Sequence, residues 1–292
     1  MAASKTAEYV ALYRALETLE HGREPLFRDP YAGVFLSRRL SVLLRTAQIR
    51  PLHRLVSRYL DVVAPGARVV AAARTRFIDD MVRRRLAEGI GQLVVLGAGF
   101  DCRAHRLDEL RAARVFEVDR SETQEAKRLH LGRASMPMHH DVRYVAADFL
   151  GDGVDEQLAA AGWDATRRTL FLWEGVTNYL TEQAVLSVLR FIGRAAAGSW
   201  LVFSYVHRGL LDGTLDLEGG EWLLGKVQAL SEPWTFGLYP AEVAPCLSRL
   251  GLALRENLDA DECRGLYLGG AASFGGKANA LFAACRVAVA EV

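Results

Sequence analysis

The sequence predicts an α/β protein with a doubly wound, mostly parallel sheet, and two observations carry this prediction. From residue 89 onward, short apolar runs alternate with segments of helical periodicity. The first apolar run ends in a glycine turn, Gly97-Ala-Gly99, and the second ends on Asp119, about 20 residues further along. A glycine turn and an acid at this interval are typical of a sheet that binds a ribose-bearing cofactor at its carboxyl edge.

Residues 1–88 are expected to form a helical cap and a lead-in helix. Apolar residues recur with helical spacing over residues 5–20 and 31–60. A turn separates these stretches at Pro30, because proline disfavours helix in the residue before it. A long helix over residues 67–88 follows, with apolar residues on one face and arginines opposite.

Residues 89–206 are predicted to be the cofactor-binding core. The predicted strands are short and apolar, and helical segments separate them; the candidates are 92–97, 114–119, 142–147, 169–174 and 199–205. Two helix starts carry capping signals. Ser121 and Gln124 have the spacing of a capping box, and Thr181 is expected to cap a helix over residues 182–195.

The alternation stops after this core. Residues 207–250 are rich in glycine, tryptophan and proline near their start, and they are expected to form a lid or substrate insertion over the carboxyl edge of the sheet. Residues 251–292 are expected to complete the sheet with strands at 252–258 and 279–287, joined by a glycine-rich connection. Two consecutive strands without a helix between them predict a closing antiparallel hairpin. All these segments are expected to form one integrated domain.

The composition argues against several classes of partner. The formal net charge of the 292 residues is +1, so no strong field favours nucleic acid or an anionic membrane. No stretch approaches the ~20 apolar residues of a membrane span, and the N-terminus lacks an apolar signal core, so we expect a cytoplasmic protein. The four cysteines form no CxxC pair, which implies neither a metal site nor a disulfide framework. The expected partner is a small molecule, and nothing in the sequence indicates the oligomeric state.

The residues inside the glycine turn indicate which cofactor it holds. A pyrophosphate-binding turn needs a third glycine where this chain has Cys102, and Asp101 precedes it. A carboxylate there suits a cofactor with a sulfonium and an amino group, which points to S-adenosylmethionine rather than a nicotinamide. Its ribose hydroxyls can donate to Asp119, with Glu117 on the same strand face as the alternative ligand. Asp101 can act as helix N-cap, ligand or both, and Arg103 is expected to cap or pair with its own helix.

Five motifs follow one another along the chain: Ala73-Arg-Thr-Arg-Phe-Ile-Asp79, Leu96-Gly-Ala-Gly-Phe-Asp-Cys-Arg103, Phe116-Glu-Val-Asp119, Ala147-Asp-Phe149 and Trp173-Glu-Gly-Val-Thr-Asn-Tyr-Leu180. Together they resemble the class I methyltransferases, and more narrowly the leucine carboxyl methyltransferase family. The N-terminal Ser4-Lys-Thr-Ala and Leu26-Phe-Arg-Asp-Pro-Tyr-Ala32 resemble its bacterial, polyketide-type O-methyltransferase branch. The resemblance covers residues 4 to about 206, and the remainder matches only in outline.

The resemblance implies ligands for the amino acid end of S-adenosylmethionine. Arg74 would pair with the methionine carboxylate through its planar fork, and Arg14 stands where the family often has a second cation. Gly97 and Gly99 would let the backbone approach the methionine portion. Glu174 would lie near the cofactor amine.

The resemblance also implies the ligands of the nucleoside. Asp119 would accept hydrogen bonds from the ribose hydroxyls. Asp148 and the Phe149 backbone would read the amino edge of the adenine, and the Phe149 ring would wall the base. The product left after methyl transfer would be S-adenosylhomocysteine.

The acceptor is the least specified part of the reaction. A carboxylate has a pKa near ~4 and needs no general base, whereas a phenol with a pKa near ~10 usually benefits from one. His53 and His207 are the candidate bases, although a structural role is the favoured interpretation of each. Tyr179 and Arg208 are the other acceptor-side candidates, with Arg208 as an anchor for an acidic substrate.

The leading interpretation is an S-adenosylmethionine-dependent O-methyltransferase that forms a methyl ester on a small or medium organic or natural-product acid. Methylation of a phenol or other hydroxyl in secondary metabolism is the alternative. Two interpretations from other classes remain: a nicotinamide-dependent oxidoreductase and a non-catalytic cofactor-binding protein. The missing third glycine, the Asp148-Phe149 pair and the final hairpin argue against the oxidoreductase.

Overall fold

The computed structural model describes residues 4–139, 141–149, 151, 153–215, 217–269 and 277–292. Within them, seven strands form one sheet in the order β3-β2-β1-β4-β5-β7-β6. Neighbouring strands from β3 to β5 run parallel, while β7 is antiparallel to both β5 and β6. The strands are β1 (Gln92–Leu96), β2 (Arg114–Asp119), β3 (Val142–Ala146), β4 (Thr169–Trp173), β5 (Trp200–Val206), β6 (Ala253–Asp259) and β7 (Cys285–Glu291). This is the mostly parallel sheet that the alternating pattern predicted.

The central strands β1 and β4 are buried at every residue. Continuous apolar sequence is expected of parallel strands that are covered on both faces. The chain order reverses between them, because β1 is followed outward by β2 and β4 by β5. Ligands of open α/β sheets bind outside the carboxyl ends of the strands at such a switch point. Two short helices begin near these ends, α5 (Arg103–Arg106) and η3 (Thr177–Tyr179), whereas η2 (Asp108–Ala112) directly precedes the amino end of β2.

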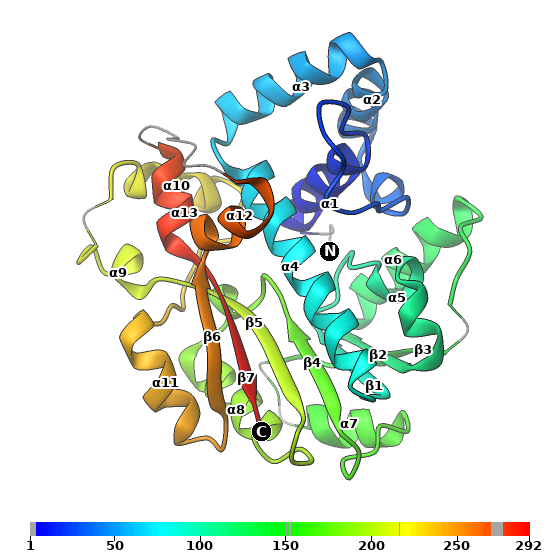
Figure 1. The fold of residues 1–292 in the computed structure, drawn as a ribbon, viewed down its shortest axis with the longest axis vertical. Helices are drawn as coiled ribbons and strands as arrows, with labels where there is room; N and C mark the ends of the chain where they lie inside the picture. The colour runs from blue at the N-terminus through cyan, green and yellow to red at the C-terminus, as the bar shows by residue number, and fades with distance from the viewer. Residues whose placement is uncertain (1–3, 140, 150, 152, 216, 270–276) are drawn as a thin grey trace.

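The N-terminal helices lie over the carboxyl edge of the sheet (Figure 1). The C-terminus lies at the other end of the molecule, because β7 runs antiparallel to β5 and pairs Glu291 with Trp200. The cap and lead-in helices are α1 (Lys5–Thr18), η1 (Ala32–Phe35), α2 (Arg38–Ala47), α3 (Arg50–Val63) and α4 (Ala67–Ala87). One face of α4, with Phe77, Ile78 and Met81, is buried against residues of the sheet.

The helix after β2, α6 (Ser121–Arg133), begins where it was predicted, but the expected capping box is wrong. The N-cap is Arg120, and no side chain makes a capping bond. The Gln124 amide instead donates to the backbone oxygens of Glu117 and Val145, at 2.9 and 2.8 Å. Gln124 is buried against the strands, so its polar group satisfies carbonyls of β2 and β3 rather than its own helix.

Helices α7 (Val154–Ala160), α8 (Glu182–Ile192) and α11 (Pro240–Ser248) contribute to a second core cluster on the sheet. Thr181 caps α8 as predicted, accepting from the N–H of Ala184 at 3.3 Å. Helix α11 lies in the segment expected to be a lid, yet Val243 and Leu247 pack into the sheet core. Only the earlier part of that segment is therefore free to cover the carboxyl edge.

That earlier part contains α9 (Arg208–Leu211) and α10 (Gly220–Ala229). It leaves the sheet at the end of β5 and returns beside the same place, where His207 and Leu238 form a parallel bridge. This bridge holds the start of α9 next to the carboxyl end of β5.

The predicted C-terminal hairpin is correct in its antiparallel pairing and wrong in its connection. Helices α12 (Ala260–Leu268) and α13 (Lys277–Ala284) lie between β6 and β7, and the last strand begins at Cys285 rather than at residue 279. A capping box between Asp259 and Glu262 starts α12, and it is a local signal that the sequence carries. The residues of α13 are alanine-rich, which favours helix over strand. Most of the glycine-rich connection lies outside the described residues.

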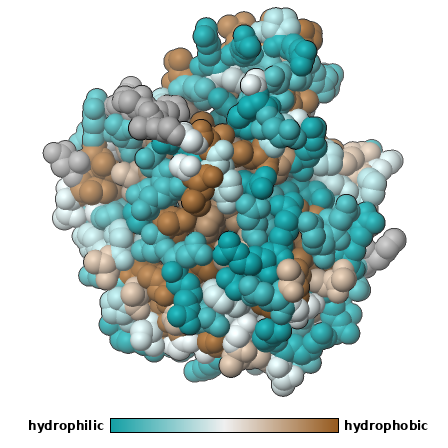
Figure 2. Space-filling model, viewed as in Figure 1, coloured by the Kyte–Doolittle hydropathy of each residue, from teal (hydrophilic) through white to brown (hydrophobic). Residues whose placement is uncertain are grey.

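Hydrophobic side chains stand among hydrophilic ones on the cap in Figure 2. Six of the nine large hydrophobic residues described as exposed lie between residues 42 and 63, on or between α2 and α3. No helix in the described part of the chain is long and apolar enough to span a membrane.

Candidate functional site

The glycine turn is folded against the end of β2. Gly97 and Gly99 have φ angles of +66° and +44°, in the left-handed region that favours glycine. The Gly97 N–H donates to the Val118 oxygen at 2.7 Å, and the Gly99 N–H donates to Asp119 Oδ2 at 2.7 Å. The turn and the acid, which the sequence placed about 20 residues apart, are thus in direct contact.

The space around the two glycines differs. A Cβ added at Gly97 would stand 2.4 Å from Val176 Cγ2, so that position is closed by protein. A Cβ added at Gly99 would meet no described heavy atom nearer than 3.9 Å, and one at Gly175, at the end of β4, would meet none within 4 Å. The turn therefore leaves open room beside Gly99 of the kind that a close-lying cofactor needs.

The two carboxylates at the end of β2 have different environments. Glu117 is 1% exposed and pairs with Lys127 Nζ at 2.6 Å. Asp119 is partly exposed and accepts from Gly99. The alternative of Glu117 as the ribose ligand is disfavoured, because its charge is already neutralised inside the protein.

Arg74 and Glu174 meet beside this turn. Arg74 Nε lies 2.7 Å from Glu174 Oε1, and both side chains keep some exposure, 17% and 16%. Arg103 Nη1 lies 2.8 Å from the other oxygen of Glu174. Burial alone would raise the pKa of Glu174, but the guanidinium groups of Arg103 and Arg74 outweigh it and lower that pKa to about 2. Glu174 is therefore an anion at neutral pH.

Asp101 is held on its own turn rather than left free. Its Oδ1 accepts from the N–H of Arg103 at 2.7 Å, and its Oδ2 pairs with the Arg103 guanidinium. Burial would raise the pKa of Asp101, but Arg103 and Arg14 hold it well below its usual range. Arg103 does pair near its own helix as expected, and it also reaches Asp79 at 2.8 Å.

Arg14 lies next to the turn, and two of its guanidinium nitrogens make hydrogen bonds. Its Nε donates to Asp29 Oδ2 at 2.9 Å, and its Nη2 donates to the backbone oxygen of Phe100 at 2.5 Å. The structure therefore brings Arg14 to the predicted site, in contact with protein groups.

The predicted adenine ligands follow β3. Asp148 is exposed, Phe149 is half-buried, and the Phe149 ring lies 6.2 Å from that of buried Trp173 at the end of β4. Asp148 and Phe149 follow the strand next to β2, on the outer side of Asp119.

The acceptor-side candidates are spread over separate elements. Tyr179 is half-buried in η3, and exposed Arg208 lies 3.6 Å from Glu182. His53 is buried inside the cap, with Nε2 3.5 Å from the Leu16 oxygen. It packs between α3 and α1, which favours its structural interpretation.

His207 caps α9. Its Nδ1 accepts from the backbone N–H of Gly209 at 3.0 Å, so the neutral ring carries its proton on Nε2. Burial and the nearby Arg286 lower the pKa of His207, which keeps the ring neutral near pH 7. In this state the ring can donate a hydrogen bond, but its one lone pair is occupied.

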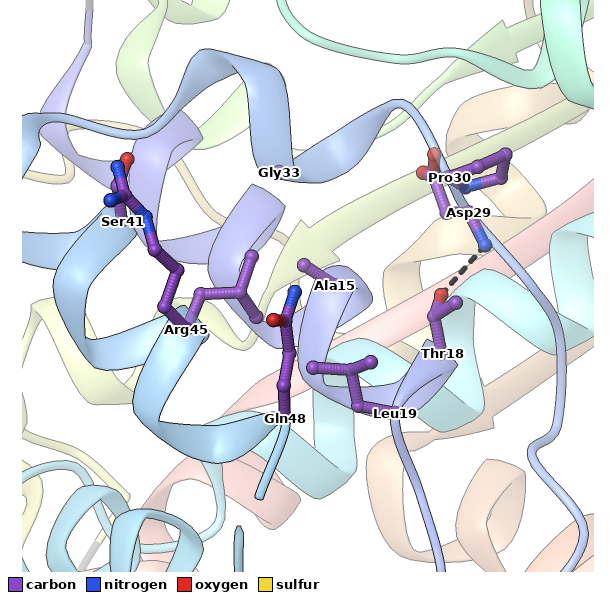
Figure 3. Close-up of a pocket in the computed structure, with 10 residues that line it drawn as sticks. Ala15, Thr18, Leu19, Asp29, Pro30, Gly33, Ser41, Arg45 and Gln48 are labelled. Carbon is purple, nitrogen blue, oxygen red and sulfur yellow. Dashed lines mark hydrogen bonds between the residues drawn. The ribbon is translucent and has the colours of Figure 1, made fainter. Parts of the chain in front are cut away.

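The glycine turn does not line either of two hollows on the described residues. The larger, about 370 Å³, lies between α1, the 29–33 segment and α2, where Asp29 N–H donates to Thr18 Oγ1 at 2.7 Å (Figure 3). The other, about 270 Å³, is lined by residues of α8 and α11 and by Arg208 and Leu238. The groups that fit a nucleoside cofactor therefore lie outside these two hollows.

Sequence reasoning missed three charged residues of this region. Asp79 and Arg106 form a two-point ion pair, with both contacts at 2.7 Å, and Lys127 neutralises Glu117. Arg103 and Arg106 both contact Asp79. Their spacing of three residues, which places them on one helix face, is the local sequence signal for a shared acidic partner. The acid they share is on α4, so only packing brings them together.

Comparison with known proteins agrees with this geometry. The family model for leucine carboxyl methyltransferase matches residues 7–193. A Frankia alni protein is 35% identical over 208 residues, covering 71% of this chain and 70% of its own length. A Streptomyces coelicolor protein is 36% identical with the same coverage, and both are named "putative S-adenosyl-L-methionine-dependent methyltransferase".

Solved structures agree on the fold. A Thermobifida fusca crystal structure, described as that of a "putative methyltransferase", has a TM-score of 0.59 at 17% identity, covering 97% of this chain and 93% of its own. A DUF574 family protein from Streptomyces avermitilis has a TM-score of 0.55 at 16% identity, covering 96% of both chains. The sheet order and these matches confirm the predicted class I methyltransferase-like fold. With the family model matching residues 7–193 and two relatives above 30% identity, the chain belongs to the leucine carboxyl methyltransferase family.

Proposed function

We propose that this methyltransferase forms methyl esters on a small or medium organic acid, with S-adenosyl-L-methionine as the methyl donor. The donor follows from the family and from relatives named for dependence on it. Membership in a methyltransferase family sets aside the nicotinamide oxidoreductase. The choice of a carboxylate acceptor is our proposal, and one observation supports it. The Nδ1 lone pair of His207, at the end of β5, already accepts a hydrogen bond from the Gly209 N–H.

The residues present fit the donor. The Arg74–Glu174 pair is itself a cation beside an anion, which is the complement of an amino acid zwitterion. Arg74 would take the carboxylate through charge-assisted hydrogen bonds, and ionised Glu174 would take the ammonium. Both retain solvent exposure, so neither needs to leave a sealed core to change partner.

The nucleoside would lie between the turn and β3. Asp119 would accept from the ribose hydroxyls with the lone pairs that Gly99 and Arg120 leave unused. The open space beside Gly99 lets a ligand approach the backbone. Asp148 and Phe149 would border the adenine.

When bound, the donor supplies a methyl group on sulfur, and the acceptor oxygen forms its bond to that carbon as the carbon–sulfur bond breaks. A carboxylate loses its charge in this step and releases no proton, so the enzyme need only align the groups and exclude water. His207 would donate from Nε2 to the acceptor and hold it, with no proton to remove. A phenol would instead need a lone pair that Gly209 already occupies.

The test is a screen with donor labelled in the transferred methyl group, over carboxylic acids and matched phenols. Label that is lost on mild alkaline hydrolysis would identify an ester and support the proposal. Alkali-stable label on phenols alone would replace it with ether formation. The Arg74→Gln variant, which should bind donor poorly, is the control for non-enzymatic methylation.

A further inference from the structure

The Leu26–Ala32 motif that resembles the bacterial branch has no role in the site described so far. Its central acid, Asp29, is 1% exposed and pairs with Arg14 from α1. We infer that Asp29 and Arg14 are positioning residues that hold the glycine turn in its cofactor-binding shape, and that Arg14 is not a ligand of the donor carboxylate. This inference rests on the proposed site for the donor and is independent of the acceptor.

Arg14 reaches the turn through a backbone atom. Its Nη2 donates to the Phe100 oxygen at 2.5 Å, and Phe100 directly follows Gly99, whose N–H donates to Asp119 at 2.7 Å. The position of Asp119 relative to the turn thus depends on the Gly99–Phe100 segment, to which Arg14 is hydrogen-bonded. A change in Arg14 should reach the ribose side of the site.

Asp29 is held in place by hydrogen bonds that do not involve Arg14. Its Oδ1 accepts from the N–H groups of Tyr31 and Ala32 at 3.1 and 3.0 Å, and its own N–H donates to Thr18 Oγ1 at 2.7 Å (Figure 3). Its Oδ2 is then left to accept from Arg14 Nε at 2.9 Å. A buried carboxylate held by several donors sets the orientation of the arginine that pairs with it.

The cap contacts Phe100 at a second point. Phe35, at the end of η1, stacks on the Phe100 ring with centroids 4.5 Å apart and an interplanar angle of 9°. One contact from the cap therefore holds the Phe100 carbonyl and another holds its ring. Together they make the cap and the glycine turn one packed unit.

Burial distinguishes Arg14 from Arg74. The Arg14 side chain is 10% exposed and its partner Asp29 is 0% exposed, whereas Arg74 and Glu174 are 17% and 16% exposed. A donor carboxylate that replaced either contact of Arg14, at Nε or at Nη2, would displace a fully buried acid or a backbone carbonyl. Displacing either would leave a buried polar group without its partner, which is costly.

A series of ion pairs also connects Asp29 with the residues proposed to bind the amino acid end of the donor. Asp29 Oδ2 lies 3.7 Å from Arg106 Nε, and Arg106 and Arg103 both bind Asp79, at 2.7 and 2.8 Å. Arg103 then binds Glu174 at 2.8 Å. Alternating charges thus connect Asp29 to the Arg74–Glu174 pair.

The test uses two ligands, S-adenosylhomocysteine and 5′-methylthioadenosine, which lacks the amino acid. For Asp29→Asn and Arg14→Gln we expect both affinities to fall, by about tenfold to a hundredfold. Arg14→Lys should not restore them, since an ammonium cannot make both contacts. Arg23→Gln is the matched control: it breaks another cap ion pair, at 2.7 Å, with the fully buried acid Glu17, and should leave both affinities unchanged.

A carboxylate ligand would behave differently. If Arg14→Gln weakened S-adenosylhomocysteine alone, as is expected for Arg74→Gln, or if Asp29→Asn left both affinities unchanged, the positioning role would be overturned. Failure of the unmodified chain to bind S-adenosylhomocysteine would instead refute the proposed donor site. Amide hydrogen exchange without ligand gives a second readout: Asp29→Asn and Arg14→Gln, but not Arg23→Gln, should speed exchange at Gly99, and unchanged exchange would contradict the inference.

Discussion

Arg74 and Glu174, 100 positions apart in the sequence, form an ion pair at 2.7 Å beside the glycine turn. Each belongs to a motif that the sequence made conspicuous, and the tertiary structure makes them partners. Because an arginine and a glutamate in contact present opposite charges to the same space, they match both ends of an amino acid zwitterion.

Removing either charge of this pair should weaken donor binding. For Arg74→Gln we expect the affinity for S-adenosylhomocysteine to fall about tenfold to a hundredfold, the usual effect of losing a hydrogen bond to a charged group. Glu174→Gln should act in the same direction through the ammonium. Calorimetric titration measures both, and affinities within twofold of the unmodified chain would move the amino acid end elsewhere.

Substitution of the two acids of β2, Glu117 and Asp119, should have different effects on donor affinity and on stability. Asp119→Ala should reduce S-adenosylhomocysteine affinity strongly, because its carboxylate is partly exposed at the glycine turn. Glu117→Gln should instead mainly lower the free energy of unfolding, since it leaves buried Lys127 without its counter-charge. Titration and thermal unfolding of both variants would show the reverse pattern if Glu117 were the ribose ligand.

The glycines of the turn should differ in the consequence of adding a methyl group. Gly97→Ala places a Cβ 2.4 Å from Val176 at φ +66°, and should destabilise the fold by about 1–3 kcal/mol or more. Gly99→Ala meets no described atom within 3.9 Å, so it should cost less stability and lose donor affinity. Equal unfolding midpoints and equal affinities for the two variants would contradict this assignment of open space.

The Glu174 carboxyl should make stability depend on acid pH. Its pKa is lowered from 4.5 to about 2 in the folded chain, so its contribution is fully present above about pH 4.5 and is lost as the pH falls toward 2. Glu174→Gln should flatten the fall in unfolding free energy over this window. Denaturant unfolding between pH 2 and pH 6 measures the difference, and parallel curves for the two proteins would refute the shift.

His207 tests the nature of the acceptor. His207→Asn retains a side chain that can cap α9, so the fold should persist. If the acceptor is a carboxylate, turnover should fall by less than about tenfold, as for a lost positioning contact. A loss of about a hundredfold or more, together with a pH–rate profile that loses its fall on the acidic side, would identify a general base and a hydroxyl acceptor.

Much of this fold was predictable from local sequence. Six of the seven predicted strands lie within one residue of their predicted limits at each end. The five parallel strands follow from short apolar runs between helical segments, which are typical of a sheet covered on both faces. The final connection differs from the prediction: the Asp259–Glu262 capping box begins a helix there, and the alanine-rich segment predicted as a strand forms α13.

The sequence alone determined the sheet, the glycine turn and the interval to Asp119, since these depend on periodicity and spacing along one stretch of chain. Tertiary structure alone decided which charges meet. Arg14 binds Asp29 and Phe100, and Glu117 binds Lys127. His207 Nδ1 accepts a hydrogen bond from the Gly209 N–H. A side chain's charge is written in the sequence, but which partner neutralises it depends on which elements pack together, and in the case of Arg14 that contact crosses from α1 to the end of β1.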